Sequence, residues 1–306
     1  MAALLTIRDN IRGFISKYDK FITPAVKFLI YLLMFWSINH LTGYNETVSS
    51  GLIIFLLSVV CAFMTEGIAL ALGGIFACAQ LFSASKEIAV VFLIIFILMY
   101  CIYIRFFPKT AWLIMFAPLF FIFKMQYLLP VIAGMFAGPA GIISAAFGCI
   151  FYYFMTHAAL YVDLMKVTDE EDLIEGYKYM FQHLVEDKNL ILTIVVFAVV
   201  IVITALIYRF SFDYSWYAAI IVGGLFEIIL FLIGNFALEA SLSVAGILLG
   251  SLGAIIISII IQFFKVVVDY SRTEMTQFED DEYYYYVKAV PKVVVAKSNK
   301  NVRKIR

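Results

Sequence analysis

Residues 108–149 read PKTAWLIMFAPLFFIFKMQYLLPVIAGMFAGPAGIISAAFGC, and this stretch decides the fold. It is apolar almost throughout, yet Pro118, Pro130 and the pair Gly138-Pro139 interrupt it. A proline inside a helix removes one backbone hydrogen bond and clashes with the preceding turn, so we do not expect one continuous helix. In a lipid bilayer a broken helix is tolerated only where protein or a water-filled cavity surrounds it. The stretch therefore predicts a buried, broken-helix centre in a polytopic membrane protein.

The composition of the whole chain points to the same class. Its 306 residues are 64% hydrophobic and 14% charged, whereas soluble domains average about 25% charged residues. The apolar residues occur in runs that reach the roughly 20 residues needed to cross a bilayer. We therefore expect an all-α, polytopic integral membrane protein with 8–10 transmembrane helices, including interrupted or re-entrant segments.

The distribution of charge along the chain predicts its orientation. Both terminal regions carry Lys and Arg, and the positive-inside rule places both on the cytoplasmic side, which requires an even number of crossings. Eight crossings result if the interrupted segments Gly51–Phe82 and Met125–His157 each cross once, and ten if each crosses twice. We favour ten, because that count places Arg105, Lys109 and Arg209 on the cytoplasmic side.

Five regions follow from these expectations. They are a cytoplasmic amphipathic N-terminal segment (1–21), a first transmembrane bundle with interrupted helices (22–158), an acidic amphipathic helix outside the bilayer (159–189), three transmembrane helices (190–265) and a cytoplasmic charged tail (266–306). The third region carries eight acidic and three basic residues over positions 159–188. Its apolar residues repeat at helical spacing, so this face is expected to lie on the membrane or on the protein.

Two acidic residues in apolar surroundings are candidates for binding a solute or ion. Glu227 lies eleven residues into the expected span Trp216–Gly234, and a carboxylate at that depth marks a functional site unless a neighbouring Ser, Tyr or Lys pairs with it. Glu66 lies at the interruption Thr65-Glu66-Gly67 in the middle of Gly51–Phe82. It would meet a solute if Gly51–Phe82 is re-entrant, or lie in a solvated turn if that segment is two short spans.

The remaining candidates lie in and around the broken stretch. Lys124 could pair with Glu227, contact an anion or extend to the membrane interface. Around it, Pro130, Gly134, Gly138, Pro139 and Gly141 form the expected binding region. Gly246, Gly250 and Gly253 follow small-residue spacing and predict close helix packing.

Motifs for catalysis are missing from the sequence. The four cysteines stand alone in apolar runs, and no phosphate-binding glycine loop or nucleophile elbow occurs. We therefore expect no enzymatic activity, no cofactor, no metal centre and no nucleic-acid partner. ATP-driven transport would require a separate ATPase subunit.

The tail allows three interpretations. From Val287 onward it carries seven Lys or Arg and no acidic residue, which suits anionic lipids of the inner leaflet. Alternatively, EYYYYVKAVPKVVVAK (282–297) is rich in β-branched and aromatic residues and could form a strand or hairpin that docks a cytoplasmic protein. The third interpretation is a disordered tail.

Two local resemblances extend these expectations. Leu129, Pro130, Gly134, Gly138, Pro139 and Gly141, within residues 128–148, resemble a stretch of the substrate-binding S components of energy-coupling-factor vitamin transporters. That resemblance implies solute binding and an ATPase partner, although this chain has more expected spans. The ending TQFEDDEYYYYVKAVPK (276–292) is similar to uncharacterised polytopic membrane proteins of Gram-positive anaerobes, which implies no activity.

Together these observations predict a multi-pass protein of a bacterial cytoplasmic membrane. We expect a transport-type permease, or the membrane subunit of a multi-component transporter, for a small solute or ion. The solute would bind around Pro130–Gly141, with Glu227 as the polar or ion-coupling group. The alternative is a non-transporting scaffold that recruits cytoplasmic partners through its tail. Besides the lipid bilayer, a second copy of the chain is also an expected partner.

Overall fold

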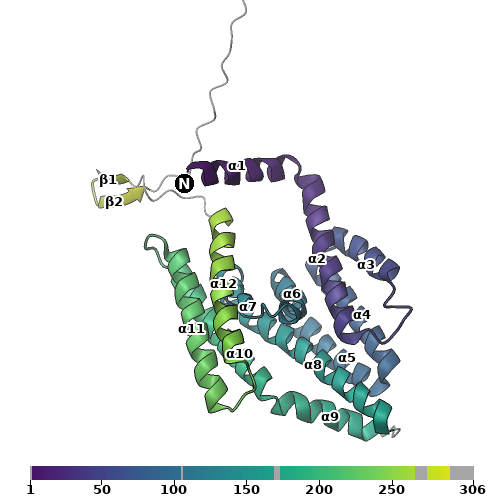
Figure 1. Ribbon diagram of the computed structural model, residues 1–306. Coiled ribbons are helices and arrows are strands. Elements are labelled where there is room, and N and C mark those ends of the chain that lie inside the picture. The colour runs from purple at the N-terminus through teal and green to yellow at the C-terminus, as the bar shows by residue number, and fades with distance from the viewer. Residues whose placement is uncertain (1, 105, 169–172, 266–273, 290–306) are drawn as a thin grey trace, which may run out of the picture. The chain divides into compact units, whose positions relative to one another are not determined.

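The computed structural model describes residues 2–104, 106–168, 173–265 and 274–289 (Figure 1). The chain forms two compact units, one of Thr23–Ile260 and the other of Met1–Ile22 with Ile261–Arg306. The helices and strands are α1 (Ala2–Lys17), α2 (Asp19–Thr42), α3 (Gly51–Phe63), α4 (Glu66–Ala84), α5 (Lys86–Met99), α6 (Ala111–Ile122), α7 (Leu128–Phe136), α8 (Gly141–Thr168), α9 (Leu173–Glu186), α10 (Lys188–Tyr208), α11 (Ser215–Ala237), α12 (Val244–Lys265), β1 (Glu274–Glu279) and β2 (Tyr284–Ala289). Three short helical turns join them: the π-helix η1 (Tyr100–Ile104) and the 3₁₀ turns η2 (Pro108–Thr110) and η3 (Gly138–Ala140).

Six helical segments of the described chain are long and apolar enough to cross a membrane. They are α2, α4, the segment Gly138–Leu164 with most of α8, α10, α11 and α12. Gly51–Phe63 and Pro108–Ile122 are apolar but shorter. These segments confirm the prediction of a helical chain with several membrane-spanning helices. The all-α prediction leaves out the antiparallel hairpin of β1 and β2, whose second strand lies within 282–297, where a strand or hairpin was one of the three interpretations of the tail.

The predicted helix breaks are only partly correct. α3 ends at Phe63 and α4 begins at Glu66, so the predicted interruption at 65–67 is confirmed, although Glu66 and Gly67 already belong to α4. Pro118 does not interrupt α6. Pro130 lies in the first turn of α7, where a missing backbone N–H removes no intrahelical hydrogen bond. The break between α7 and α8 occurs at Gly138, whose φ of +64° is a backbone conformation that glycine adopts at little energetic cost.

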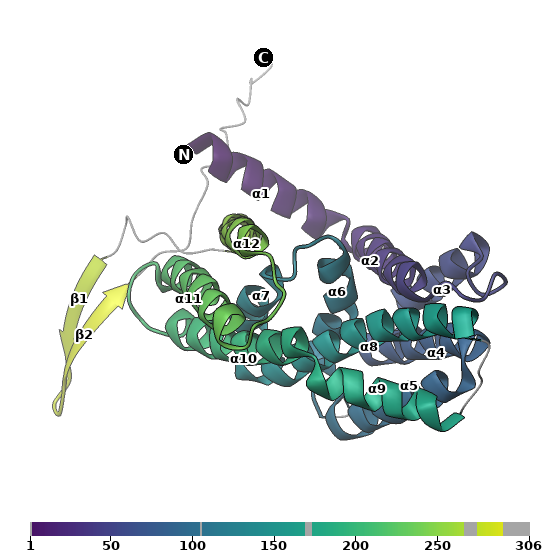
Figure 2. The same cartoon turned by 60° about the horizontal axis from the view of Figure 1, so that its bottom comes forward.

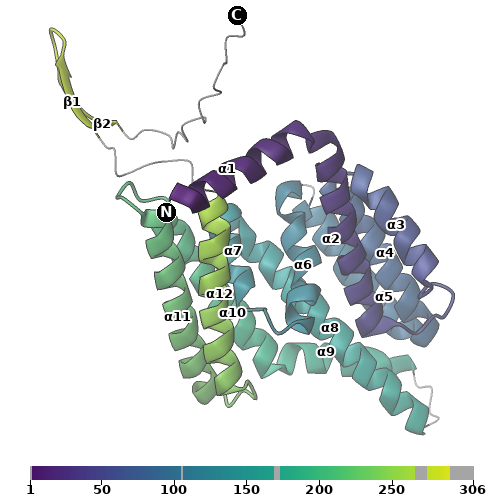
Figure 3. The same cartoon turned by 45° about the horizontal axis from the view of Figure 1, so that its top comes forward.

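Within residues 23–260, the short helices α6 and α7 lie between two groups of longer helices. Figures 1 and 3 show them between α2–α5 on one side and α10–α12 on the other. α6 packs against α4 and α8, and α7 packs against α8, α10 and α11. Each broken helix is therefore surrounded by protein on several sides, as a broken helix at membrane depth requires.

The acidic connection differs in detail from the prediction. α8 continues to Thr168, past the expected boundary at 158, and the helix after it is α9. α9 packs against α5 and α8 (Figure 2), and its Met180 is buried there. Tyr177, Phe181 and Val185 form a neighbouring stripe that is exposed. An exposed apolar stripe on such a helix suits the headgroup region of a bilayer, so the protein and the membrane can each cover part of the apolar surface.

Glycines permit the closest contacts between these helices. A β-carbon on Gly134 of α7 would lie 2.6 Å from the β-carbon of Thr204 and 3.1 Å from the carbonyl oxygen of Ile201, both on α10. A β-carbon on Gly253 of α12 would meet nothing within 4 Å. The two glycines therefore form a matched pair, one in a tight contact and one in open space.

We predict that Gly134→Ala destabilises the protein by about 1–3 kcal/mol, because the added methyl group overpacks the α7–α10 contact. Gly253→Ala should change stability by no more than about 1 kcal/mol, in the stabilising direction, because alanine favours the helix. Thermal unfolding of both purified variants in detergent measures the difference. Equal unfolding midpoints for the two variants would contradict the described packing of α7.

Candidate functional site

Glu227 is a buried carboxylate in the middle of a membrane-length helix. It lies twelve residues after the start of α11 and ten before its end, about 18 Å and 15 Å along the helix axis. Its side chain is 0% exposed, and neither carboxylate oxygen has a hydrogen-bond partner among the described residues. Burying a charged group without a partner is strongly unfavourable, so this position needs a functional explanation.

Two hydroxyl groups from neighbouring helices approach Glu227. Ser251 on α12 faces the carboxylate, although their geometry does not complete a hydrogen bond. Thr204 on α10 directs its Oγ1 at the place that a β-carbon of Gly223 would occupy. Gly223 precedes Glu227 by one helical turn on the same face of α11, and helical side chains lean towards that preceding turn. The carboxylate therefore leans towards the surface that Thr204 covers.

Tyr127, in the loop before α7, lies near Glu227, and Gln126 is the residue before it. Tyr127 lies within electrostatic range of Glu227, and its ring packs on Gly250 of α12. The side-chain oxygens of Gln126, Thr204 and Ser251 are also buried without a hydrogen-bond partner in the described chain. We call Glu227, Thr204, Ser251 and Gln126 the buried oxygen cluster. It joins α10, α11 and α12 to the turn between the two short helices.

That turn, residues 123–127, lies deep along the neighbouring helices. Tyr127 contacts Gly250, six residues into α12, and Phe123 stacks on Trp36, six residues before the end of α2, with ring centroids 5.9 Å apart. Six residues correspond to about 9 Å of helix. The turn therefore lies about 9 Å inside the ends of two membrane-length helices.

A cleft of about 820 Å³ opens at the break between α3 and α4. Glu66, Lys27 and Lys109 supply its charged groups, and Tyr100 and Cys101 of the π-helix line it as well. Single-turn π-helices occur frequently at functional sites. The cleft thus combines the π-helix η1, two lysine side chains and one carboxylate.

Tyr103 ties the π-helix to the break after α7. Its hydroxyl accepts a hydrogen bond from Ser144 Oγ at 3.0 Å and donates one to the carbonyl oxygen of Ala140. Thr110 Oγ1 lies 3.2 Å from the same hydroxyl. The helix that lines the cleft is therefore bonded directly to η3 and the start of α8.

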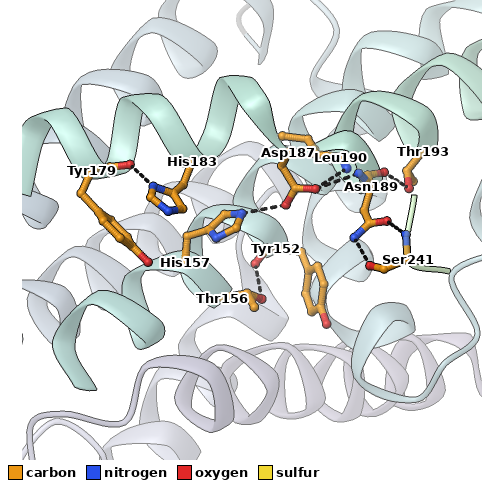
Figure 4. A network of polar contacts seen from close by, with 10 residues as sticks. All are labelled: Tyr152, Thr156, His157, Tyr179, His183, Asp187, Asn189, Leu190, Thr193 and Ser241. Carbon is orange, nitrogen blue, oxygen red and sulfur yellow. Dashed lines mark hydrogen bonds and ion pairs between the residues drawn. The ribbon is translucent and has the colours of Figure 1, made fainter. Parts of the chain in front are cut away.

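A polar network fixes the start of α10 (Figure 4). His157 Nε2 of α8 and Asp187 Oδ2 lie 2.7 Å apart, while Asp187 Oδ1 accepts hydrogen bonds from the backbone N–H groups of Asn189 and Leu190. Asn189 then exchanges two hydrogen bonds with Ser241 in the loop between α11 and α12. The network joins α8 and α10 to that loop, and so fixes the relative placement of the helices that carry the buried oxygen cluster.

The predicted residues fall into separate places. Glu66 lines the cleft, whereas Glu227 belongs to the buried oxygen cluster. Lys124 lies in the turn before α7, exposed and with a φ of +56°. It forms no ion pair with Glu227, whose carboxylate has no partner among described residues, so the idea of a lysine partner is wrong.

The broken stretch itself is closely packed. Pro130 is buried in α7, and Gly134 lies against Thr204. Gly138 is covered by the guanidinium of Arg209, and Gly141 by Ala133, Ala137 and Leu113. Pro139 is exposed. Of these residues, Gly134 is the one that touches a member of the buried oxygen cluster, through Thr204.

The glycines of α12 differ from one another. Gly250 is covered by the ring of Tyr127 rather than by another helix. Gly246 meets only Ser243, one turn away, and Gly253 meets nothing within 4 Å. The small-residue motif therefore supports one close contact in the described chain, and its other two positions are open.

The sequence analysis did not identify several residues of the buried oxygen cluster and of the cleft. Thr204, Ser251 and Gln126 complete the buried cluster, and Lys27 lines the cleft. A signal existed for the two hydroxyl residues, because each is a polar residue within a strongly apolar span. No pattern in the sequence indicates that they face Glu227, since three different helices bring them together.

In comparisons with known proteins, no family model, curated protein or solved structure matched this chain. We therefore infer function from the site geometry.

Cys101 provides a direct test of the cleft. It is exposed and lines the cleft, while Cys61 and Cys149 are buried and Cys78 is partly buried. We predict that a membrane-impermeant maleimide modifies Cys101 first, and from the cytoplasmic side of sealed vesicles, since exposure governs thiol modification. Mass spectrometry of peptides from inside-out and right-side-out vesicles measures both site and side. Cys149→Ser, which removes a buried thiol, is the control and should label as the wild type does. Labelling that persists unchanged in Cys101→Ser would disprove the accessible cleft.

Proposed function

We propose that this chain is a transport-type membrane protein, either a permease or the membrane subunit of a multi-component transporter, for a small solute or ion. The observation that carries the proposal is Glu227, fully buried and without a partner in the described chain, at the centre of a membrane-length helix. Ionisable groups at such depth are costly and are typical of ion and proton pathways. A purely structural role would be expected to include a hydrogen-bond or ion-pair partner.

We propose eight full crossings and one re-entrant hairpin in a bacterial cytoplasmic membrane. α6 and α7 have 12 and 9 residues, about 18 Å and 14 Å of helix, while the hydrocarbon core is about 30 Å thick. The depth of the turn between them supports a hairpin that enters and leaves on one side. α2, α4, α5, α8, α10, α11 and α12 would then cross. We count α3 with them although its 13 residues are also short, because the break after it lines an open cleft rather than lying between helices. This arrangement keeps both terminal regions cytoplasmic and α9 outside, as the ten-crossing count does.

The cleft is our proposed entrance for the solute. Two lysines against one glutamate favour a solute with net negative charge or a zwitterion, which the three groups would bind through complementary charges. In the proposed orientation the cleft opens on the cytoplasmic side, because Lys109 lies at the start of the hairpin. A concave site with few polar groups in mainly apolar walls is typical of small-molecule binding.

The broken helix α7 is our proposed moving element. Through η3 it connects to Tyr103 beside the cleft, and through Gly134 it contacts Thr204 of the buried oxygen cluster. Discontinuous helices form the binding sites of several classes of secondary transporter. A displacement of α7 would therefore alter the cleft and the cluster together, which is what coupling of a solute to an ion requires.

Solute-evoked currents in proteoliposomes test this function. We predict that the purified protein gives charge movement on a solid-supported membrane after addition of at least one class among amino acids, organic acids, nucleotides and vitamins. Glu227→Gln should reduce that current to the level of empty liposomes, because the amide cannot carry the coupling charge. Glu239→Gln is the matched control, since this side chain is 86% exposed. Equal currents in wild type and Glu227→Gln would refute the coupling role.

A non-transporting scaffold is the second candidate, and the hairpin in the tail favours it. β1 and β2 pair from Glu274↔Ala289 to Glu279↔Tyr284, and every residue of both strands is exposed. In the turn, the Asp280 carboxylate accepts hydrogen bonds from the Tyr285 hydroxyl at 2.8 Å and from the backbone N–H groups of Tyr283 and Glu282. These bonds, the one from Tyr285 first, lower the pKa of Asp280 below its ordinary value. The paired, exposed strands could add to a sheet of a cytoplasmic partner; the basic residues 290–306, predicted to bind lipid, lie outside the described residues.

Affinity capture distinguishes the scaffold from the transporter. If the scaffold is correct, full-length protein captures specific cytoplasmic proteins that a truncation after Lys265 does not, because the truncation removes the hairpin. Met275→Lys and Tyr286→Lys, at two strongly exposed positions of the hairpin, should weaken the same capture without affecting membrane insertion. An unchanged set of captured proteins after truncation would remove the scaffold. Capture of an ATPase only by full-length protein would favour the multi-component transporter.

A further inference from the structure

The buried oxygen cluster contains five oxygen atoms that complete no hydrogen bond in the described part of the chain. Both carboxylate oxygens of Glu227, Oγ1 of Thr204, Oγ of Ser251 and Oε1 of Gln126 are buried and have no hydrogen-bond partner in the described part of the chain. They come from α11, α10, α12 and the turn before α7. Unsatisfied buried polar atoms are rare in native proteins and call for an explanation such as a bound ion.

We propose that the Glu227 carboxylate, with the hydroxyl groups of Thr204 and Ser251 and the amide oxygen of Gln126, binds one sodium ion in the middle of the membrane bundle. Five oxygen atoms of this kind match what a hard cation prefers as ligands. Gly223 makes the approach of Thr204 feasible, because a side chain at that position would occupy the space that the Thr204 hydroxyl fills.

Charge balance selects a monovalent ion. Glu227 is the one acidic side chain of the cluster, and the exposed Lys124 is not paired with it. A monovalent cation neutralises the site, whereas a divalent cation would leave a positive charge in an apolar bundle, which is strongly unfavourable. Potassium is larger and needs more ligands than these five oxygens supply.

A proton on Glu227 accounts for fewer of the buried, unpaired oxygen atoms than a sodium ion does. Protonation of Glu227 adds a single O–H donor, which can satisfy one neighbouring oxygen. Thr204 and Ser251 carry hydroxyl donors of their own, but in the described geometry neither hydroxyl completes a hydrogen bond to the carboxylate, so a proton alone leaves these oxygens unpaired. One cation among them satisfies the carboxylate, both hydroxyl oxygens and the amide oxygen at once.

This inference deepens the proposed function and rests on it for its physiological meaning, since a sodium site at Glu227 would be the coupling site of the transporter. The two can fail separately. Currents that depend on Glu227 but not on sodium would remove the sodium site and leave transport coupled to protons. Sodium binding without solute-evoked currents would keep the site and remove the transport proposal.

Sodium-dependent thermal stability of the full-length protein in detergent tests the site. At constant ionic strength, NaCl in place of choline chloride should raise the unfolding midpoint of the wild type by about 3 °C or more, because a ligand that binds the native state stabilises it. KCl should have a smaller effect. Thr204→Val and Ser251→Ala, which keep approximately the same shape, should each raise the half-saturating NaCl concentration about tenfold.

Ser258→Ala is the matched control. Ser258 is another buried hydroxyl on α12 without a partner among the described residues, but it lies seven residues from Ser251 in the sequence, about 10.5 Å along the helix. Its response to NaCl should equal that of the wild type. If a variant fails to fold, equilibrium binding of ²²Na⁺ to the wild-type protein is measured instead of that variant's thermal shift. We expect close to one sodium ion bound per protein chain. Equal stabilisation by NaCl and choline chloride, or no saturable ²²Na⁺ binding, would overturn the proposal.

Discussion

A carboxylate held in the centre of an apolar helix bundle is the constraint on which this structure depends. Water is the usual partner of a charged carboxylate, and within a bilayer the protein or a bound ion must take that place. Gly223 and Gly224 leave room on α11 for Thr204 and Ile255 to pack directly on it, and Thr204 thereby lies one helical turn before Glu227. The arrangement of three helices is thereby linked to the chemistry of one side chain.

The bundle also contains two short helices, α6 and α7, at its centre. Neither is long enough to cross a membrane alone, and their turn contacts α2 on one side and α12 on the other. The polar network of His157, Asp187, Asn189 and Ser241 joins the interior of α8 to the start of α10 and to the loop between α11 and α12. A fixed frame around a short, broken segment is an arrangement in which one element can move without unfolding the rest.

The sequence predicts the class of protein and the helix breaks better than it predicts the site. Apolar runs and helix breakers are local signals, so the helical membrane class and an interruption close to Thr65 were correctly expected. Pro118 was misjudged because a proline can remain inside a helix when its neighbours satisfy the freed backbone group. Glu227 could be singled out, since one carboxylate in an apolar span is visible in any window. Its neighbours could not, because Thr204, Ser251 and Gln126 are separated by many residues and meet only through packing.

The most direct measurement is infrared difference spectroscopy of the reconstituted protein on exchange of choline for sodium. Carboxylate stretching bands respond to the ion that the carboxylate binds, and the Glu227→Gln variant identifies the bands of this residue. We predict a sodium-induced carboxylate difference band in the wild type that is missing in Glu227→Gln and present in Glu239→Gln. A difference spectrum without that band, or with an equal band in Glu227→Gln, would contradict an ion-binding role for the buried carboxylate.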